Sequence, residues 1–298
     1  MYLANLRTSL VSCESLTLRR PEAIVIGDSH SYADWDFAEL QRGLGQRLGA
    51  CALGGLYVDS VPMLVDYVLQ SSPGATTLIL GLSPRMFWES PSRKEQIDSH
   101  VRLIPSLKPN AAPYVRRVLF GEPLPYDLEA EAVRRHTDRL ESLDEGAILE
   151  RLAESQQSIR TLRDWNQRLG ESRHMPEADR PVADVCRIVR AHKLRLLVLH
   201  MPESPYLEAR YPEEVWRAYL AAMRSFDRCA EKVIVEKAVS YGLGNRHYIN
   251  RELKDTHNYG KWGRPGPLTD DLDFDADHLN PVGAGKFTRA VLAKFPPR

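Results

Sequence analysis

The stretch that decides the fold is Ala23-Ile24-Val25-Ile26-Gly27-Asp28-Ser29. Its four apolar residues end in a turn of small and polar residues, which is typical of a buried strand that leads into a helix. Three further runs of this kind end in a similar way, at residues 51–53, 77–80 and 194–199. Strands that alternate with helical stretches form parallel sheets, so we predict an α/β fold. The expected form is a flavodoxin-like sheet between two helical layers.

One long segment interrupts this alternation between the third and fourth strands. Residues 85–189 are many more than a crossover helix needs, so we predict an insertion there, within a single domain over residues 1–298. The prolines of residues 84–113 favour an irregular loop beside a pocket. The stretch at 128–168 is rich in Glu, Arg and Leu and favours one or two amphipathic helices.

Three elements are expected after the fourth strand. They are a long helix, a short strand and a final helix that starts at a proline, at residues 212–237, 247–249 and 281–294.

The composition is that of an ordinary globular protein. Of the 298 residues, 43% are hydrophobic and 27% are charged. The 40 Lys+Arg balance the 40 Asp+Glu, so no overall field attracts nucleic acid. No apolar stretch reaches the roughly 18 residues of a membrane span, and the first twenty or so residues lack the apolar core of a signal peptide. The sequence as given therefore predicts a cytoplasmic protein, or a periplasmic or extracellular one if a signal peptide was removed.

The four cysteines are Cys13, Cys51, Cys186 and Cys229. They form no C-x-x-C pair and have no histidine at zinc-like spacing, which argues against structural zinc. Free, buried thiols are the favoured interpretation. One or two disulfides are the alternative for an exported protein.

The first residue with a chemical role is Ser29. A serine just beyond a buried strand exposes its hydroxyl at the edge of the sheet and brings backbone N–H groups toward a reacting carbonyl. The alternative is that Asp28 and Ser29 are ordinary turn and helix-capping residues.

The second block is Asp275-Ala276-Asp277-His278-Leu279-Asn280-Pro281, just before the final helix. A nucleophilic serine needs a base for its proton, and the base needs a carboxylate that orients the imidazole. His278 and Asp275 can fill these two roles. The alternative is a helix N-terminus that carries acidic residues because they favour the helix dipole.

Together, Gly27-Asp28-Ser29 and Asp275-x-x-His278, followed by His-Leu-Asn-Pro-x-Gly-Ala, resemble the SGNH/GDSL hydrolase family. The resemblance implies a Ser29, His278 and Asp275 triad. It spans the strand framework, roughly residues 23–82 and 194–295, and leaves the insertion unexplained.

The same resemblance implies where an oxyanion would bind. The backbone N–H of Ser29 and that of Gly54 or Gly55, after the second strand, are its expected donors. The family's G-x-N-D block is replaced here by Gly81-Leu82-Ser83-Pro84, so the Asn donor is absent and Ser83 is its candidate substitute. Losing such a donor costs about 10²–10³ in rate.

Two other histidines are candidates for substrate contact. His30 adjoins the nucleophile and His200 ends the fourth strand, although for each a buried, hydrogen-bonded role is the alternative. The aspartates of residues 270–277 lack the glycine and glutamate of an EF-hand loop, and no strand is followed by a nucleotide-binding glycine loop. We therefore expect neither a metal nor an organic cofactor.

These features predict a serine esterase that acts on a small-molecule or carbohydrate ester. Two alternatives stay open. One is an O-acyltransferase with the same triad, and the other is a degenerate family member that binds a glycan or a partner without catalysis.

Overall fold

A parallel sheet of five strands is the centre of the computed structural model, within the residues that it describes. These residues are 13–14, 16–89, 93–107, 144, 146, 148–150, 163, 166–167, 169, 173–174, 178–249 and 276–296. In their order across the sheet the strands are β2 (Leu48–Ala52), β1 (Ala23–Gly27), β3 (Thr77–Leu82), β6 (Arg195–His200) and β7 (Lys232–Ile234). All neighbours run parallel, and this order is that of flavodoxin-like sheets. The predicted fold class is confirmed.

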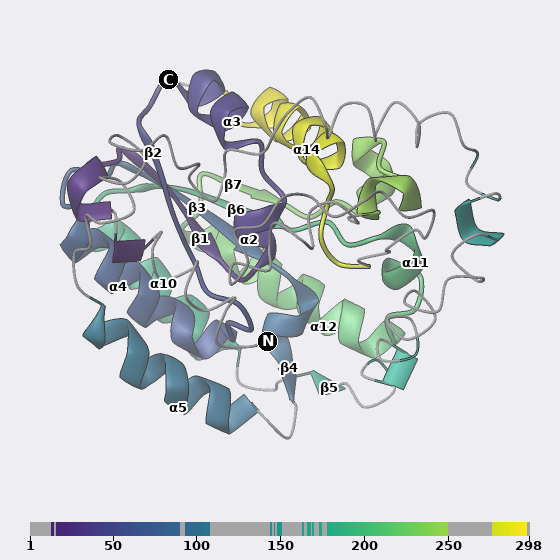
Figure 1. Cartoon of the computed structure of the whole chain (residues 1–298). Helices are drawn as coiled ribbons and strands as arrows, with labels where there is room; N and C mark the ends of the chain where they lie inside the picture. Colours follow the sequence, from purple (N-terminus) through teal and green to yellow (C-terminus); the bar gives the residue numbers. More distant parts are fainter. Residues whose placement is uncertain are drawn as a thin grey trace, which may run out of the picture.

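Helices cover both faces of the sheet, which gives three layers (Figure 1). Ala23 and Val25 belong to the core on one face, whereas Ile24 and Ile26 belong to the core on the other, as the alternation of a strand requires. The helices of the first face are α3 (Phe37–Leu44) and α14 (Pro281–Lys294). Those of the second are α4 (Val61–Ser71), α10 (Asp179–Ala191) and α12 (Glu213–Arg224). Burial on both faces explains the uninterrupted apolar run of β1.

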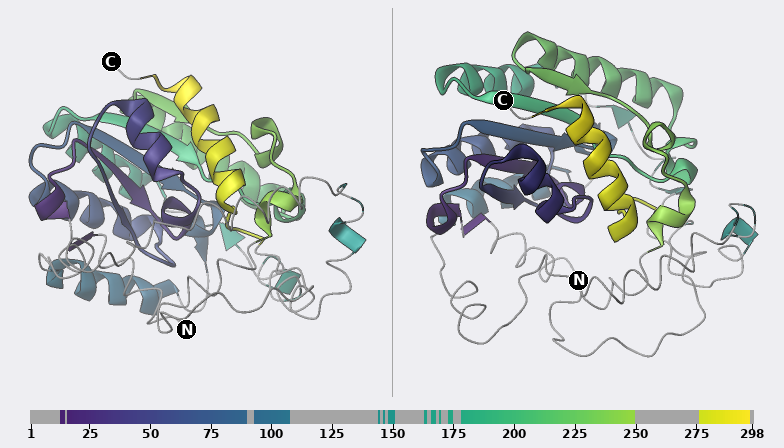
Figure 2. Two further views of the ribbon diagram at one scale, coloured as in Figure 1. Left: turned by 45° about the horizontal axis from the view of Figure 1, so that its top comes forward. Right: turned by 90° about the horizontal axis from the view of Figure 1, so that it is seen from above.

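Helix α14 has the bounds that the sequence predicted. Its N-terminus is capped by Asn280, whose side chain accepts a hydrogen bond of 3.0 Å from the backbone N–H of Gly283. Pro281 occupies the first turn, where a missing N–H costs no internal hydrogen bond. In Figure 2 this helix, in yellow, lies beside α3.

The prediction of one helix over residues 212–237 is wrong. Helix α12 ends at Arg224, a 3₁₀ turn η4 (Ser225–Arg228) follows, and the chain then forms β7, which pairs with β6. The apolar run at 233–235 is β-branched, which favours a strand, but it follows the helix without a proline or glycine that would mark the boundary. The strand expected at 247–249 is also wrong, because most of it lies in the 3₁₀ turn η6 (Asn245–Tyr248).

At its two ends, where the structure describes it, the predicted insertion has more secondary structure than the sequence indicated. The expected irregular loop contains η2 (Pro84–Phe87), β4 (Trp88–Glu89), α5 (Arg93–Leu103) and η3 (Ile104–Ser106). Strand β4 pairs antiparallel with β5 (Arg173–His174). At its far end the insertion overlaps α10, which packs on α4 as the crossover helix into β6. The helices expected over 128–168 fall almost wholly outside the described residues.

Four further short elements lie between these helices and strands. They are α2 (His30–Ala33), α11 (Pro205–Glu208), η1 (Val58–Ser60) and η5 (Ala238–Tyr241). Among the described helices, none combines the length and the apolar character needed to cross a bilayer.

The prediction of free thiols is wrong. Cys13 is bonded to Cys51 in β2, and Cys186 of α10 is bonded to Cys229, which follows η4. Each bridge joins segments about 40 residues apart, with sequence separations of 38 and 43. The pairing depends on how β2 and α10 meet distant segments, so the spacing of the cysteines alone does not reveal it.

Candidate active site

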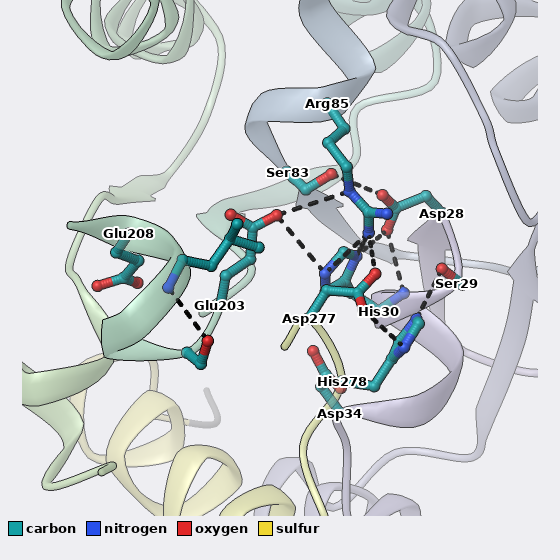
Figure 3. Close-up of polar contacts among 12 residues, drawn as sticks. Asp28, Ser29, His30, Asp34, Ser83, Arg85, Glu203, Glu208, Asp277 and His278 are labelled. Carbon is teal, nitrogen blue, oxygen red and sulfur yellow. Dashed lines mark hydrogen bonds and ion pairs between the residues drawn. The ribbon is translucent and has the colours of Figure 1, made fainter. Parts of the chain in front are cut away.

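Ser29 and His278 meet at the carboxyl edge of the parallel sheet. Ser29 follows β1 and is the N-cap residue of α2, and His278 lies two residues before the cap of α14. The Oγ of Ser29 is 2.8 Å from Nε2 of His278, although 249 residues separate them in the sequence. Figure 3 shows the two side chains pointing toward each other. Both are half-buried, so the pair is within reach of solvent.

The turn that presents Ser29 requires glycine at position 27. A Cβ atom on Gly27 would lie 2.0 Å from the hydroxyl of Ser31 and 2.3 Å from the carbonyl oxygen of Gly81. Ser31 is buried here, and its hydroxyl is 3.3 Å from the carbonyl oxygen of Ile26. The close approach of α2 to β1 and β3 therefore sets where Ser29 begins the helix.

A carboxyl group ties the loop of His278 to the same helix. Asp34, at the C-terminal end of α2, accepts a hydrogen bond of 2.8 Å from the backbone N–H of Leu279. Burial raises the pKa of Asp34 well above its ordinary value. Its second oxygen has no hydrogen-bond partner among the described residues. Asp34 thus ties the loop of His278 to the C-terminal end of α2.

The nearest described carboxylate to the second nitrogen of His278 belongs to Asp277. Its Oδ1 lies 3.5 Å from Nδ1 of His278, and its Oδ2 forms an ion pair of 2.7 Å with Nη2 of Arg85. The predicted third residue, Asp275, lies outside the described residues, as does the acidic run before it. Its role as the orienting carboxylate stays a prediction.

A buried cluster surrounds Asp28 directly before the nucleophile. Oδ1 of Asp28 accepts hydrogen bonds from the backbone N–H and the ring of His30, and Oδ2 accepts one of 2.6 Å from Ser83. Burial by itself would raise the pKa of this carboxyl group, but His30, followed by Arg85 and Ser83, holds it well below its ordinary value. Burial lowers the pKa of His30 in spite of the adjacent carboxylate. The cluster therefore contains an ionised Asp28 and a neutral imidazole.

Arg85 lies against the ring of His30 and links this cluster to Asp277. Its Nη2 is 3.3 Å from Nδ1 and 3.2 Å from Nε2 of His30, so the guanidinium lies over the ring (Figure 3). Burial would lower the pKa of Arg85, but Asp277, Glu203 and Asp28 raise it, so the group stays charged.

Glu203 closes the cluster on the far side of Arg85. Its Oε1 lies 3.6 Å from Nε of Arg85 and 3.8 Å from Nε2 of His30, and its Oε2 accepts a hydrogen bond from the hydroxyl of Tyr211. Burial raises the pKa of Glu203 to about 8, against the opposing effect of Arg85. At neutral pH this glutamate is therefore mostly protonated.

The residues predicted to bind an oxyanion differ in whether the protein already uses their hydrogen-bond donors. The hydroxyl of Ser83 is buried and donates a hydrogen bond to Asp28, which argues against its use as an oxyanion donor. Gly54 and Gly55 form the turn after β2, and Gly55 has a φ of +69°, which favours glycine. Within the described part of the chain, the backbone N–H groups of Ser29, Gly54 and Gly55 form no hydrogen bond to the protein.

The two histidines proposed to contact substrate are fully buried. His30 supports the turn through Asp28, as described above. His200 has its Nδ1 2.9 Å from the hydroxyl of Tyr219, and its Nε2 is 3.5 Å from Glu208. These partners favour the structural alternative for both rings.

One group of side chains has the spacing of metal ligands, namely His30, Asp277 and His278. The guanidinium of Arg85 lies among them, 2.7 Å from Asp277 and over the ring of His30. A protein cation already neutralises this carboxylate, so we assign no metal to the group.

Sequence reasoning did not identify Asp34, Arg85 or Glu203. A signal existed for two of them, because Arg85 and Glu203 each lie three residues after the carboxyl end of a strand, β3 and β6. Charged residues at such positions face the ligand edge of a parallel sheet.

Comparison of this chain with protein-family models, with curated proteins and with solved structures finds no match.

Proposed function

We propose that this chain is a serine ester hydrolase of the SGNH/GDSL type, in which Ser29 is the nucleophile and His278 is the general base. The proposal is carried by the 2.8 Å separation of Ser29 Oγ and His278 Nε2. It is supported by the place of this pair, at the edge of the sheet where flavodoxin-like folds hold their ligands.

In the proposed reaction, Ser29 attacks the ester carbonyl while His278 takes its proton at Nε2. This requires the proton of the neutral ring to be on Nδ1, and Asp275 is the proposed carboxylate that orients the ring in this form. Among the described residues, the carboxylate of Asp277 also lies 3.5 Å from Nδ1. The imidazolium then returns its proton to the leaving alcohol, which leaves an acyl group on Ser29. A water molecule attacks this acyl group, with His278 again as base, and releases the carboxylic acid.

The backbone N–H groups of Ser29 and of Gly54 or Gly55 are the proposed donors to the oxyanion. Backbone donors that are not already used by the protein can bond to charge that develops on the substrate. We do not include Ser83 among the proposed donors, because its hydroxyl is bonded to the ionised Asp28.

We further propose an oxidising compartment, such as the periplasm or the extracellular space. The support is the pair of disulfides, because such bonds persist mainly outside the reducing cytosol. An acylated sugar or polymer at that location is the proposed class of substrate.

A fluorophosphonate probe tests the nucleophile directly, because it reacts with activated serines. We expect the wild type to be labelled and Ser29→Ala and His278→Ala to be unlabelled. Ser106→Ala is the matched control, since this exposed serine on η3 bonds only to the carbonyl oxygen of Leu103. Hydrolysis of p-nitrophenyl acetate, butyrate and octanoate, and of acetylated sugars, then defines the acyl group.

A folded wild type that resists the probe would contradict the proposal and favour a binding module. Labelling that survives in Ser29→Ala would place the reactive serine elsewhere. If labelling depends on Ser29, added sugar hydroxyls decide between water and an alcohol as the acceptor.

A further inference from the structure

Asp28 supplies the side chain that caps the helix at the nucleophile. Its Oδ1 accepts a hydrogen bond of 3.1 Å from the backbone N–H of His30, and its carbonyl oxygen accepts one of 3.1 Å from that of Ser31. These N–H groups belong to the first turn of α2, where a helix offers them no partner of its own. A side-chain oxygen that accepts from the N–H two residues later is a common form of helix cap.

Ser29 stands at the cap position of α2 but does not cap it with its side chain. That side chain makes no capping hydrogen bond to the described residues, and the backbone is helical, with a φ of −58° and a ψ of −29°. A serine that caps a helix has an extended backbone instead. The hydroxyl of Ser29 is therefore available to Nε2 of His278, at 2.8 Å.

The carboxylate of Asp28 is held by two further donors (Figure 3). Oδ1 also accepts from Nδ1 of His30 at 2.9 Å, and Oδ2 accepts from the hydroxyl of Ser83 at 2.6 Å. Ser83 directly follows β3, so the cap is tied to a strand that pairs with β1. Asp28 is only 3% exposed. A buried carboxylate with three donors has little freedom to rotate, so the cap stays in place.

The other polar side chains of α2 do not replace this cap. The hydroxyl of Ser31 is directed to the carbonyl oxygens of Ile26 and Gly81, at 3.3 and 3.4 Å. Asp34 lies at the other end of the helix, where it bonds to the loop before α14. Without Asp28, the nearest residue of a type that favours helix caps is the nucleophile itself.

We propose that Asp28 is a positioning residue, which caps α2 in place of Ser29 and so keeps the nucleophilic hydroxyl within hydrogen-bonding distance of His278. Once this cap is lost, Ser29 takes it over by adopting an extended backbone, which turns its Oγ away from the imidazole. The inference rests on the proposed function, because only a nucleophile requires that its hydroxyl be kept from capping. Asp28 touches no substrate in this scheme, so its loss should lower kcat and leave KM nearly unchanged.

The first test is the rate of fluorophosphonate labelling in three variants of Asp28. Asp28→Asn removes the charge but keeps an oxygen that can accept from the N–H of His30, whereas Asp28→Ala and Asp28→Gly remove both. We expect Asp28→Asn to stay within about threefold of the wild type and the other two to lose on the order of 10²-fold, as a misplaced nucleophile does. The same losses should appear in kcat for p-nitrophenyl acetate.

The asparagine variant separates the cap from the charge. If folded Asp28→Asn reacts as slowly as Asp28→Ala, the charge is responsible and the inference is overturned. It is also overturned if Asp28→Ala and Asp28→Gly react as fast as the wild type. Glycine is tolerated at helix caps, so Asp28→Gly keeps the test decisive if the alanine variant does not fold.

The matched control is Asp36→Ala. Asp36 caps the next helix, α3, where its side chain accepts a hydrogen bond of 2.9 Å from the N–H of Glu39. Loss of this cap should lower the urea midpoint of unfolding, yet labelling of Ser29 should stay within about threefold of the wild type. A loss of labelling as large as that in Asp28→Ala would contradict the inference, because general destabilisation would then explain both variants.

The second test does not depend on activity. Crystal structures should show the contact between Ser29 Oγ and His278 Nε2 in the wild type and in Asp28→Asn. In Asp28→Ala we expect an extended backbone at Ser29, with its hydroxyl bonded to an N–H group of α2. A helical backbone and an intact contact in Asp28→Ala would overturn the inference. Absence of labelling in the wild type would instead contradict the proposed function, and the conformation of Ser29 would still decide the role of Asp28.

Discussion

Asp34 and Leu279 are joined by a hydrogen bond of 2.8 Å between a carboxyl oxygen and a backbone N–H, across 245 residues of sequence. Asp34 ends the short helix that begins at Ser29, and Leu279 directly follows His278. This contact therefore helps to set the distance between the hydroxyl of Ser29 and the imidazole of His278.

The relationship predicts different outcomes for two substitutions of Asp34. Asp34→Asn keeps a side-chain oxygen that can accept from the N–H of Leu279, so the free energy of unfolding should change little. Asp34→Ala leaves the buried N–H of Leu279 without a partner and should lower the free energy of unfolding by about 1–3 kcal/mol. Urea unfolding measures both, and the labelling rate of Ser29 should fall only in the alanine variant. Equal effects of the two substitutions would contradict this role.

Ser83 offers a test between a structural and an oxyanion role. Its hydroxyl donates to the ionised Asp28 at 2.6 Å, so Ser83→Ala should lower the free energy of unfolding by about 1.5–3 kcal/mol. Ser83→Thr retains the hydroxyl and serves as the control. A loss of about 10²–10³ in kcat with unchanged stability would show instead that Ser83 binds the oxyanion.

Glu203 predicts a dependence of stability on pH. Burial raises its pKa in the folded protein to about 8, so between its unfolded value of about 4.5 and pH 8 the folded state keeps a proton that the unfolded state has lost. Its contribution to stability is complete below the unfolded pKa and is lost as the pH rises through 8, by about 1.4 kcal/mol per unit inside that range.

The measurement is urea unfolding of the wild type and of Glu203→Gln between pH 4.5 and 9. The wild type should lose more stability over this range than the glutamine variant, which has no proton to lose. Parallel curves for the two proteins would show that Glu203 titrates normally in the folded state.

The bridge between Cys186 and Cys229 predicts a large effect of reduction. It closes a separation of 43 residues between α10 and the residue that follows η4, and cross-linking a loop of this length stabilises a protein by about 4 kcal/mol in the chain-entropy model. Replacing both cysteines by alanine should lower the free energy of unfolding by an amount of that order. Mass spectrometry of peptides from the unreduced protein checks the pairing, and any other pairing would refute it.

Local patterns were enough to predict most of the sheet. The strand at 23–27 and the helix at 281–294 were found because an apolar run, a small-residue turn and a capping asparagine are marked within a few residues. The strand at 232–234 was missed because it is only three residues long and follows a helix without a breaking residue. Its identity comes from pairing with β6, which is a contact between distant segments.

By itself the sequence determined that a serine follows one buried strand and that a histidine precedes the last helix, because both positions depend on neighbouring residues. Only the tertiary structure decided three further features. Asp277 forms an ion pair with Arg85 and lies next to the ring of His278, and the hydroxyl of Ser83 donates a hydrogen bond to Asp28. The four cysteines form two bridges. These contacts join residues from separate strands and loops. They are fixed by the order and register of the parallel strands, which no local pattern specifies.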